Sequence, residues 1–176
     1  MDTFVEQIVA RQKGVKEYAI IFSSITLAVI VTYFLFGLAL AFIGPLAFLL
    51  LVGIVYGMWW ILTNLNIEYE YSVTNGDIDI DQITAKRKRK RIVSVAGQKI
   101  ESLEPYNRRE FAGRKFDRQV MAAPSADIDE LWCFTYRSKK NGHTLVIFQP
   151  EDRVLNALKS GLSALVLRET NKKTAQ

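Results

Sequence analysis

The sequence predicts an α+β membrane protein in which an N-terminal transmembrane α-helical hairpin precedes an antiparallel β domain with a C-terminal helix. Two observations lead to this prediction. The 50 residues between Glu17 and Glu68 include no Asp, Glu, Lys, Arg or His. From residue 67 onward, short runs of alternating apolar and polar residues replace the uniform apolar stretch, and such alternation is typical of half-buried strands.

The uncharged stretch is too long for a single membrane span. As one straight helix its 50 residues would extend about 75 Å, whereas the apolar core of a bilayer is about 30 Å thick. Gly44-Pro45 offers a turn near the middle, because proline disfavours helix at the residue before it. We therefore predict a transmembrane hairpin over residues 18–65, with spans at about 18–41 and 45–64.

The charges beside the predicted spans indicate their orientation. Arg11, Lys13 and Lys16 precede the first span, while the turn between the spans has no Lys or Arg. By the positive-inside rule, both termini and the β domain face the cytoplasm of a cell membrane. Gly53 and Gly57 have the spacing of a helix-packing motif. We expect them to pack within the hairpin, with a dimer interface as the alternative, so the oligomeric state stays open.

Residues 1–17 are predicted to form an interfacial amphipathic segment. Thr3 and Glu6 have the spacing of a capping box, and an apolar stripe with helical periodicity continues through residues 3–12. One interpretation is a helix that lies on the inner leaflet of the bilayer. The other is that the stripe packs on the soluble domain.

The β domain is predicted over residues 66–169. Its clearest hairpin has Asn75-Gly76 as the turn, because both residues tolerate a positive φ. About seven short antiparallel strands are expected, at about 67–74, 77–81, 88–95, 99–105, 115–122, 130–137 and 144–149.

A C-terminal helix is expected to cap this sheet or barrel over about 150–168, since proline is favourable at a first helical position. Residues 170–176 are predicted to be a disordered tail. The apolar face of the helix comprises Val154, Leu155, Leu158, Leu162, Leu165 and Val166.

Three stretches carry a resemblance to a known family: Ile67–Gly76 (IEYEYSVTNG), Lys86–Val95 (KRKRKRIVSV) and Phe148–Glu151 (FQPE). With them, the chain resembles small bacterial membrane proteins that join a transmembrane hairpin to a bacterial pleckstrin-homology (PH)-like domain, including a family of unknown function. The resemblance implies a membrane-tethered PH-like fold and no activity. PH-type phosphoinositide sites usually lie at the loop between the first two strands, where this chain has only the Asn75-Gly76 turn.

A run of six basic residues is the most prominent candidate contact surface. One interpretation is that it binds anionic lipid headgroups, which contribute about 1 kcal/mol per basic residue near such a surface. The other is that Asp79 and Asp81 neutralise it across the sheet. A protein partner is a third possibility, and nucleic acid is not expected. The run consists of Lys86, Arg87, Lys88, Arg89, Lys90 and Arg91.

A second basic cluster contains aromatic residues and is either a solvated loop or a partner-docking loop, because arginine and aromatic residues are enriched at interfaces. The candidate docking residues are Arg108, Arg109, Phe111, Arg114 and Lys115.

No pattern in the sequence indicates catalysis, a cofactor or a metal site. Cys133 and His143 are the only residues of their types, so no internal disulfide can form and no cluster of metal ligands is expected. The net charge of +5 favours anionic partners. We therefore predict a non-enzymatic membrane-anchored scaffold that contacts the lipid bilayer and an unidentified protein partner, with anionic-lipid docking through Lys86–Arg91 as the alternative.

Overall fold

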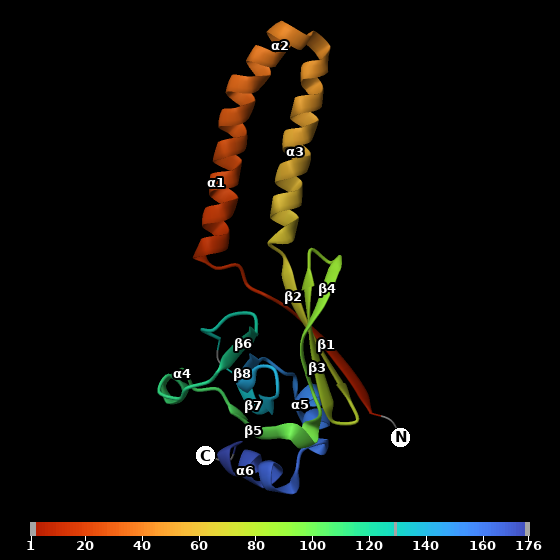
Figure 1. The fold of residues 1–176 in the computed structure, drawn as a ribbon, viewed down its shortest axis with the longest axis vertical. Helices are drawn as coiled ribbons and strands as arrows, with labels where there is room; N and C mark the ends of the chain where they lie inside the picture. The colour runs from red at the N-terminus through yellow and green to blue at the C-terminus, as the bar shows by residue number, and fades with distance from the viewer. Residues whose placement is uncertain (1–2, 129, 175–176) are drawn as a thin grey trace. The chain divides into compact units, whose positions relative to one another are not determined.

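The structure, a computed structural model, describes residues 3–128 and 130–174 and divides the chain into two compact units. One unit comprises residues 12–66, and the other comprises residues 1–11 together with residues 67–176 (Figure 1). The second unit is therefore built from both sides of the helical segment in the sequence.

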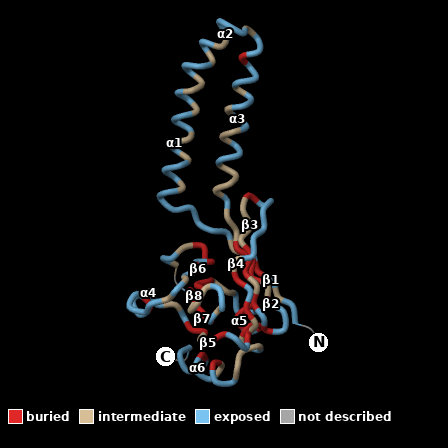
Figure 2. The backbone as a smooth tube through the Cα atoms, in the orientation of Figure 1, coloured by how far each residue is buried: buried red, intermediate tan, exposed pale blue. Residues whose placement is uncertain are grey.

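The unit of residues 12–66 is one long apolar helical segment. The helical stretch Val15–Asn64, of 50 residues, is long and apolar enough to cross a membrane, and by length and composition it counts as one candidate span. Ala47 is the only buried residue in this fully described stretch, and every other residue in it is intermediate or exposed (Figure 2). Gly44 has a φ of +56°, outside the helical region. The stretch comprises α1 (Val15–Val31), the π-helical η1 (Thr32–Phe36), α2 (Gly37–Ile43), the 3-10 helix η2 (Gly44–Leu46) and α3 (Ala47–Asn64).

The other unit contains two four-stranded sheets, of which the first is antiparallel throughout. Its order is β1 (Phe4–Ala10), β2 (Ile67–Thr74), β3 (Asp77–Thr84) and β4 (Lys88–Val95). Asn75 and Gly76 connect β2 to β3 with φ values of 52° and 86°, the left-handed values that a type I′ hairpin turn requires. Three residues, Ala85 to Arg87, connect β3 to β4; Ala85 and Lys86 each have a φ of 56°, and the backbone nitrogen of Arg87 donates to the carbonyl of Thr84 over 3.1 Å.

The first strand corrects the prediction of a helix over residues 3–12. Phe4–Ala10 is a strand that pairs with β2, from Phe4 opposite Thr74 to Ala10 opposite Glu68. Val5 and Val9 pack against the core, as the alternative interpretation expected, although from a strand. Helix was the wrong prediction because β2 offers this segment a complete row of hydrogen-bond partners, which a sequence window cannot reveal.

Gln7 fixes β1 to the rest of the unit. Its side chain is buried, its amide nitrogen donates to the carbonyl of Gln149 over 3.1 Å, and its amide oxygen accepts from the backbone nitrogen of Glu151 over 2.8 Å. One side chain therefore joins the first strand to the loop that follows the last one.

The second sheet has the order β5-β7-β8-β6: β5 (Ile100–Pro105), β7 (Trp132–Ser138), β8 (Gly142–Phe148) and β6 (Arg118–Ala122). The pairings β5–β7 and β7–β8 are antiparallel, but β6 pairs with β8 in parallel, which corrects the prediction of a fully antiparallel domain. A parallel neighbour needs a long connection, and here β7 and its flanking loops supply it. Between the sheets in sequence lies the 3-10 helix η3 (Gly97–Lys99), and between β5 and β6 lies α4 (Arg108–Phe111).

The main core lies between the inner faces of the two sheets and is closed by a helix, α5 (Asp152–Ser160) (Figure 2). Its largest members are aromatic. Phe148 makes edge-to-face contacts with Tyr71 and Phe134, at ring-centroid distances of 5.7 and 5.4 Å. Such pairs stabilise a core by about 0.5–1.5 kcal/mol beyond their buried area.

The C-terminal region corrects three expectations. The predicted single helix is two, α5 and α6 (Ala164–Thr174), because α5 ends at Gly161, and Pro150 precedes α5 instead of starting it. Leu165, expected on the apolar face, is 74 % exposed. Residues 170–174 of the predicted tail are helical, and the buried Thr170 hydroxyl donates to the carbonyl of Leu103 over 2.8 Å. Residues 175 and 176 lie outside the described residues.

Three glycines allow backbone segments that are distant in sequence to touch. A Cβ atom built on Gly161 would lie 2.5 Å from Cα of Gly76, and one built on Gly97 would lie 2.4 Å from the carbonyl oxygen of Gly76. The end of α5, the β2–β3 turn and η3 therefore meet at a point that admits no side chain.

We predict that Gly161→Ala lowers the free energy of unfolding of the full chain by about 1–3 kcal/mol, because the added methyl group overpacks this contact. Denaturant titration followed by circular dichroism measures it. Gly113→Ala is the matched control, since a Cβ there meets no atom within 4 Å, and it should change the stability by less than about 0.5 kcal/mol. Equal losses in the two variants would contradict the glycine contact.

Candidate functional site

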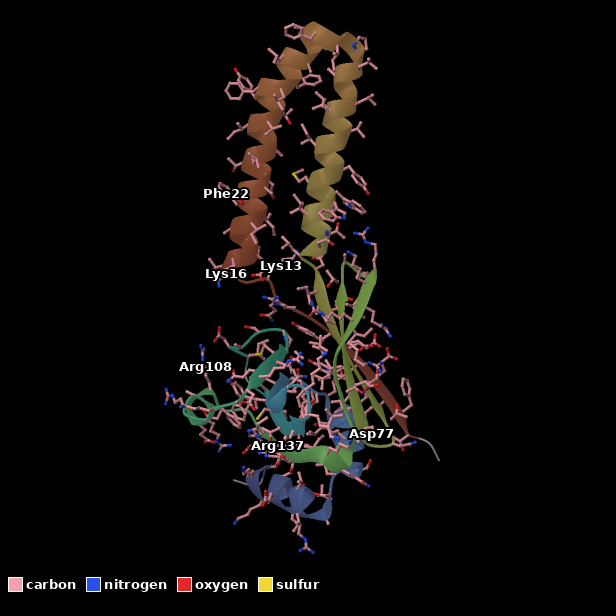
Figure 3. The ribbon with its side chains drawn as sticks, viewed as in Figure 1. Lys13, Lys16, Phe22, Asp77, Arg108 and Arg137 are labelled. Carbon is pink, nitrogen blue, oxygen red and sulfur yellow. The ribbon has the colours of Figure 1, made fainter. Side chains whose placement is uncertain are left out.

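The basic run occupies the β3–β4 turn and the first half of β4, at one end of the first sheet. At that end Thr84 pairs with Ile67, and the backbone nitrogen of Arg11 donates to the carbonyl of Ile67 over 2.9 Å. This is the end at which the chain leaves the sheet for residues 12–66. Asp77 lies at the opposite end of β3 (Figure 3).

Two arginines of the run bind carboxylates on the outer face of the sheet. Arg91, which pairs with Asp81 across the β3–β4 ladder, donates from Nε to Asp81 Oδ1 over 2.9 Å. Its Nη1 lies 2.9 Å from Oδ2 of Asp79. Arg89 forms an ion pair with Glu70 on β2, and its Nη1 lies 4.0 Å from Oδ2 of Asp81.

Two of these carboxylates are buried, so they depend on the arginines for neutralisation. Glu70 is 3 % exposed and Asp81 is 5 % exposed. Burial raises the pKa of Glu70, and the positive charge of Arg89 opposes that rise. The hydrogen bond to Asp81, with the charges of Asp79 and Asp81, raises the pKa of Arg91 above its usual value. Arg89 and Arg91 therefore have a structural role, because they neutralise carboxylates of the same sheet.

The lysines of the run differ from these arginines. Lys88 and Lys90 lie opposite Thr84 and Gln82 in the ladder, on the other face of the hairpin from Arg89 and Arg91. Lys86 lies in the turn, and all three lysines are exposed. Within residues 3–128 and 130–174, none of the three makes an ion pair or a side-chain hydrogen bond.

The second basic cluster is largely engaged in structural contacts. Phe111, expected at a docking surface, is only 3 % exposed and belongs to a small second core, so this residue was wrongly assigned to the candidate loop. Arg114 lies over the Phe111 ring at 4.6 Å and its Nη1 lies 3.4 Å from Glu104. Arg108, on α4, pairs with Asp127 at 3.3 Å (Figure 3). Arg109 and Lys115 are exposed.

Glu104 is a buried carboxylate that the sequence analysis did not single out. Besides Arg114, it binds Lys173 of α6, and its side chain is 5 % exposed. The contact joins the end of the chain to β5. No local sequence signal indicates it, because its partners are 10 and 69 residues away.

Neither Cys133 nor His143 lies in surroundings that favour catalysis or metal binding. Cys133 is buried, and burial raises the pKa of its thiol to about 12, which opposes formation of the nucleophilic thiolate. Nε2 of His143 lies 3.4 Å from Oε2 of Glu101. Among the described residues, no three His, Cys, Asp or Glu side chains are grouped so as to hold a metal ion.

A groove of about 750 Å³ runs beside β1. It is lined by residues 7–10, by Glu130 and by residues 149–153, which comprise the loop after β8 and the first two residues of α5. In the described part of the chain, β1 pairs with β2 alone, so its second edge is open. Phe4 and Ile8, on the outer face of the same strand, are 62 % and 56 % exposed.

The helix-packing glycines, Gly53 and Gly57, approach no other described part of the chain closely. A Cβ built on Gly53 or Gly57 meets no atom within 4 Å, so the expected packing of these glycines within a hairpin gains no support. A role between two copies of the chain remains a prediction.

Two packed sheets followed by C-terminal helices define the class of PH-like domains. The chain matches the family model described as "Bacterial PH-like domain (DUF6106)" over residues 1–167, so it belongs to that family, whose function is unknown. The match confirms the resemblance found in the sequence, and it includes the helical segment as well as the sheets. No curated protein and no solved structure matches the chain.

We predict that Arg89→Gln lowers the free energy of unfolding of the full chain by about 1–2 kcal/mol near neutral pH, because Glu70 then stays buried without its cation. The pKa of Glu70 is already raised in the folded protein, so ionisation of this carboxyl opposes folding. The loss of stability caused by Arg89→Gln should therefore shrink as the pH falls toward 4.5, the ordinary pKa of a glutamate carboxyl, because Glu70 then takes up a proton.

Denaturant titrations at several pH values measure this effect. Lys88→Gln is the control and should leave stability unchanged, because the Lys88 side chain makes no ion pair or hydrogen bond with a described residue. A loss from Arg89→Gln that grows on acidification would show that Glu70 is not the group left unpaired.

Proposed function

We propose that this chain is a non-enzymatic, membrane-anchored PH-like module that holds a protein partner at the cytoplasmic face of a cell membrane. The observation that carries the proposal is the hydrogen bond from the backbone nitrogen of Arg11 to the carbonyl of Ile67, 2.9 Å long, at the end of the β1–β2 ladder. It brings together the two points at which the chain enters and leaves the apolar helical segment.

This contact supports an even number of membrane crossings. Residues 11 and 67 lie side by side, so a segment between them that crosses a bilayer must return to the side from which it started. Two spans fit its 50 residues, since each span needs about 20. The turn would lie at Gly44-Pro45, where the helical φ values are interrupted.

Contacts within the helical unit also support a hairpin. The rings of Phe36 and Phe48, on either side of Gly44, are 5.6 Å apart in an edge-to-face arrangement. An apolar groove is lined from both sides of the turn, by residues from Ile25 to Tyr33 and by Ile54, Val55 and Met58. In Figure 1, α1 and α3 run beside each other.

The charges support a cytoplasmic domain. Arg11 and Lys13 come directly before α1 and Lys16 lies in its first turn. The basic run follows α3 in sequence, whereas residues around Gly44 are uncharged. Such a distribution favours a cytoplasmic location for both ends.

We predict that a single cysteine replacing Leu46, in a Cys133→Ser background, reacts with a membrane-impermeant maleimide in intact cells. A single cysteine replacing Lys172 should react only after permeabilisation. Both positions are exposed, and neither replaces a positive-φ glycine or a residue that binds Glu104. The reverse pattern would overturn the orientation, and recovery of the chain in the soluble fraction would overturn the anchoring.

The open edge of β1 supports a protein partner. An exposed strand edge can accept a further strand, with backbone hydrogen bonds supplying affinity and neighbouring pockets supplying specificity. Here the edge adjoins the groove between residues 7–10 and 149–153, and the exposed Phe4 and Ile8 side chains add apolar surface. Since PH-like domains are generally non-catalytic, binding is the activity that we assign.

We predict that a photo-crosslinking amino acid at position 8 of the full chain captures a protein in native membranes. The same amino acid at Gln119, exposed on β6, is the control and should not capture it. Mass spectrometry of the adducts distinguishes the outcomes. A lipid adduct at position 8, or an identical protein adduct at both positions, would contradict the β1 edge as the docking site.

A further inference from the structure

We infer that the contact between this domain and anionic lipid is made by three lysines, Lys86, Lys88 and Lys90, and not by the six-residue basic run as a whole. The inference rests on the membrane anchoring proposed above. It assigns the surface to the phosphate-bearing headgroups of the leaflet in which the chain is anchored.

The division within the run follows from the strand register. Successive side chains of a strand point to opposite faces, so within β4 the sequence Lys88-Arg89-Lys90-Arg91 places its lysines and its arginines on different faces of the β3–β4 hairpin. The face of Arg89 and Arg91 carries the carboxylates of Glu70, Asp79 and Asp81. Two of the run's charges are thereby neutralised within the domain.

The other face keeps its charge. Lys88 and Lys90 lie opposite the uncharged Thr84 and Gln82, and Lys86 is exposed in the adjoining turn. No carboxylate of the described chain pairs with any of the three. A compact, hydrated ammonium group on a flexible stem suits the shifting phosphates of a lipid surface, whereas arginine suits fixed bidentate pairing.

Chain connectivity favours a lipid surface as the occupant. Thr84 pairs with Ile67, and Ile67 is three residues beyond Asn64, the last residue of α3. Extended residues cover at most about 3.6 Å each and paired strands lie about 5 Å apart, so the turn can be no more than roughly 15–20 Å along the chain path from the end of α3. With α3 in a bilayer, this turn is tethered near the headgroups whatever the orientation of the domain.

The test uses the full chain in lipid nanodiscs, with Cys133→Ser and a nitroxide on a cysteine that replaces Thr84. A small fraction of lipid with a nickel-chelating headgroup relaxes the nitroxide when the turn lies at the surface. Discs of neutral phosphatidylcholine are compared with discs that contain about 30 % phosphatidylglycerol, at about 0.1 M and about 1 M NaCl, where the Debye lengths are roughly 10 and 3 Å.

We expect stronger relaxation in the anionic discs at low salt, and a return to the neutral-disc value at high salt. Replacing Lys86, Lys88 and Lys90 with glutamine should abolish the difference, since each lysine is expected to change the ratio of docked to undocked domains roughly fivefold. The control variant removes the same charge elsewhere, from the exposed Lys99, Lys139 and Lys140, and should retain the difference.

Relaxation that does not respond to phosphatidylglycerol, or a response that survives the triple lysine substitution, would overturn the inference. Failure of the chain to incorporate into nanodiscs at all would instead overturn the proposed anchoring. Thermal unfolding of the triple variant should match that of the parent, because the side chains of these lysines make no ion pair or hydrogen bond within the described chain.

Discussion

The pairing of β1 with β2 is the constraint on which the rest of the structure depends. It joins residues 4–10 to residues 68–74, across the whole helical segment. The ladder buries Val5 and Val9 against the core and places Gln7 where its amide satisfies Gln149 and Glu151. It also fixes both ends of the intervening segment at one end of one sheet, and the proposed even number of membrane crossings follows from that. The strand β1 thus contributes residues to the core of the domain and also holds the two ends of the helical segment together.

The electrostatic organisation of the first sheet follows from the same ladder. With β1 in place, Ile8 lies opposite Glu70 on the outer face, and among the described residues Arg89 is the cation that pairs with the buried Glu70. Buried carboxylates cost free energy unless they are paired. Arg89 is therefore held within the sheet by its ion pair, whereas the side chains of Lys88 and Lys90 make no ion pair with any described residue. Within β4, the uniform basic run of the sequence is divided between two faces of the sheet.

Much of the domain could be predicted from local patterns, because those patterns have local causes. Asn75 and Gly76 predict a turn because both residues tolerate the positive φ values that the turn requires. The alternation of apolar and polar residues from Ile67 to Val73 predicts a strand with one buried face. The prediction failed where a distant partner decides the conformation. Val5, Ile8 and Val9 fit a helical stripe as well as a strand, and only β2, about 60 residues later, favours the strand. The exposure of Leu165 likewise follows from the break at Gly161, which rotates α6 relative to α5.

The location of the basic run could be predicted from the sequence, but which of its residues are held in ion pairs could not. The six basic residues are evident in the sequence, but their division requires the register of β3 with β4 and the reach of Arg89 across to β2. Phe111 was wrongly predicted to lie at a docking surface, because an aromatic residue among arginines is typical of an interface. In the structure Phe111 is a core residue, and Arg114 covers its ring.

The discontinuous domain also bears on how the chain can be divided. A fragment that begins at residue 66 lacks β1, so it would expose Tyr69 and Tyr71 along the edge of β2 and leave the groups bound by Gln7 without partners. An open edge with apolar neighbours favours association with other strands. Binding observed with such a fragment would therefore report the missing strand as well as any natural ligand. Because β1 precedes the helical segment and β2 follows it, the first sheet is complete only in the full chain.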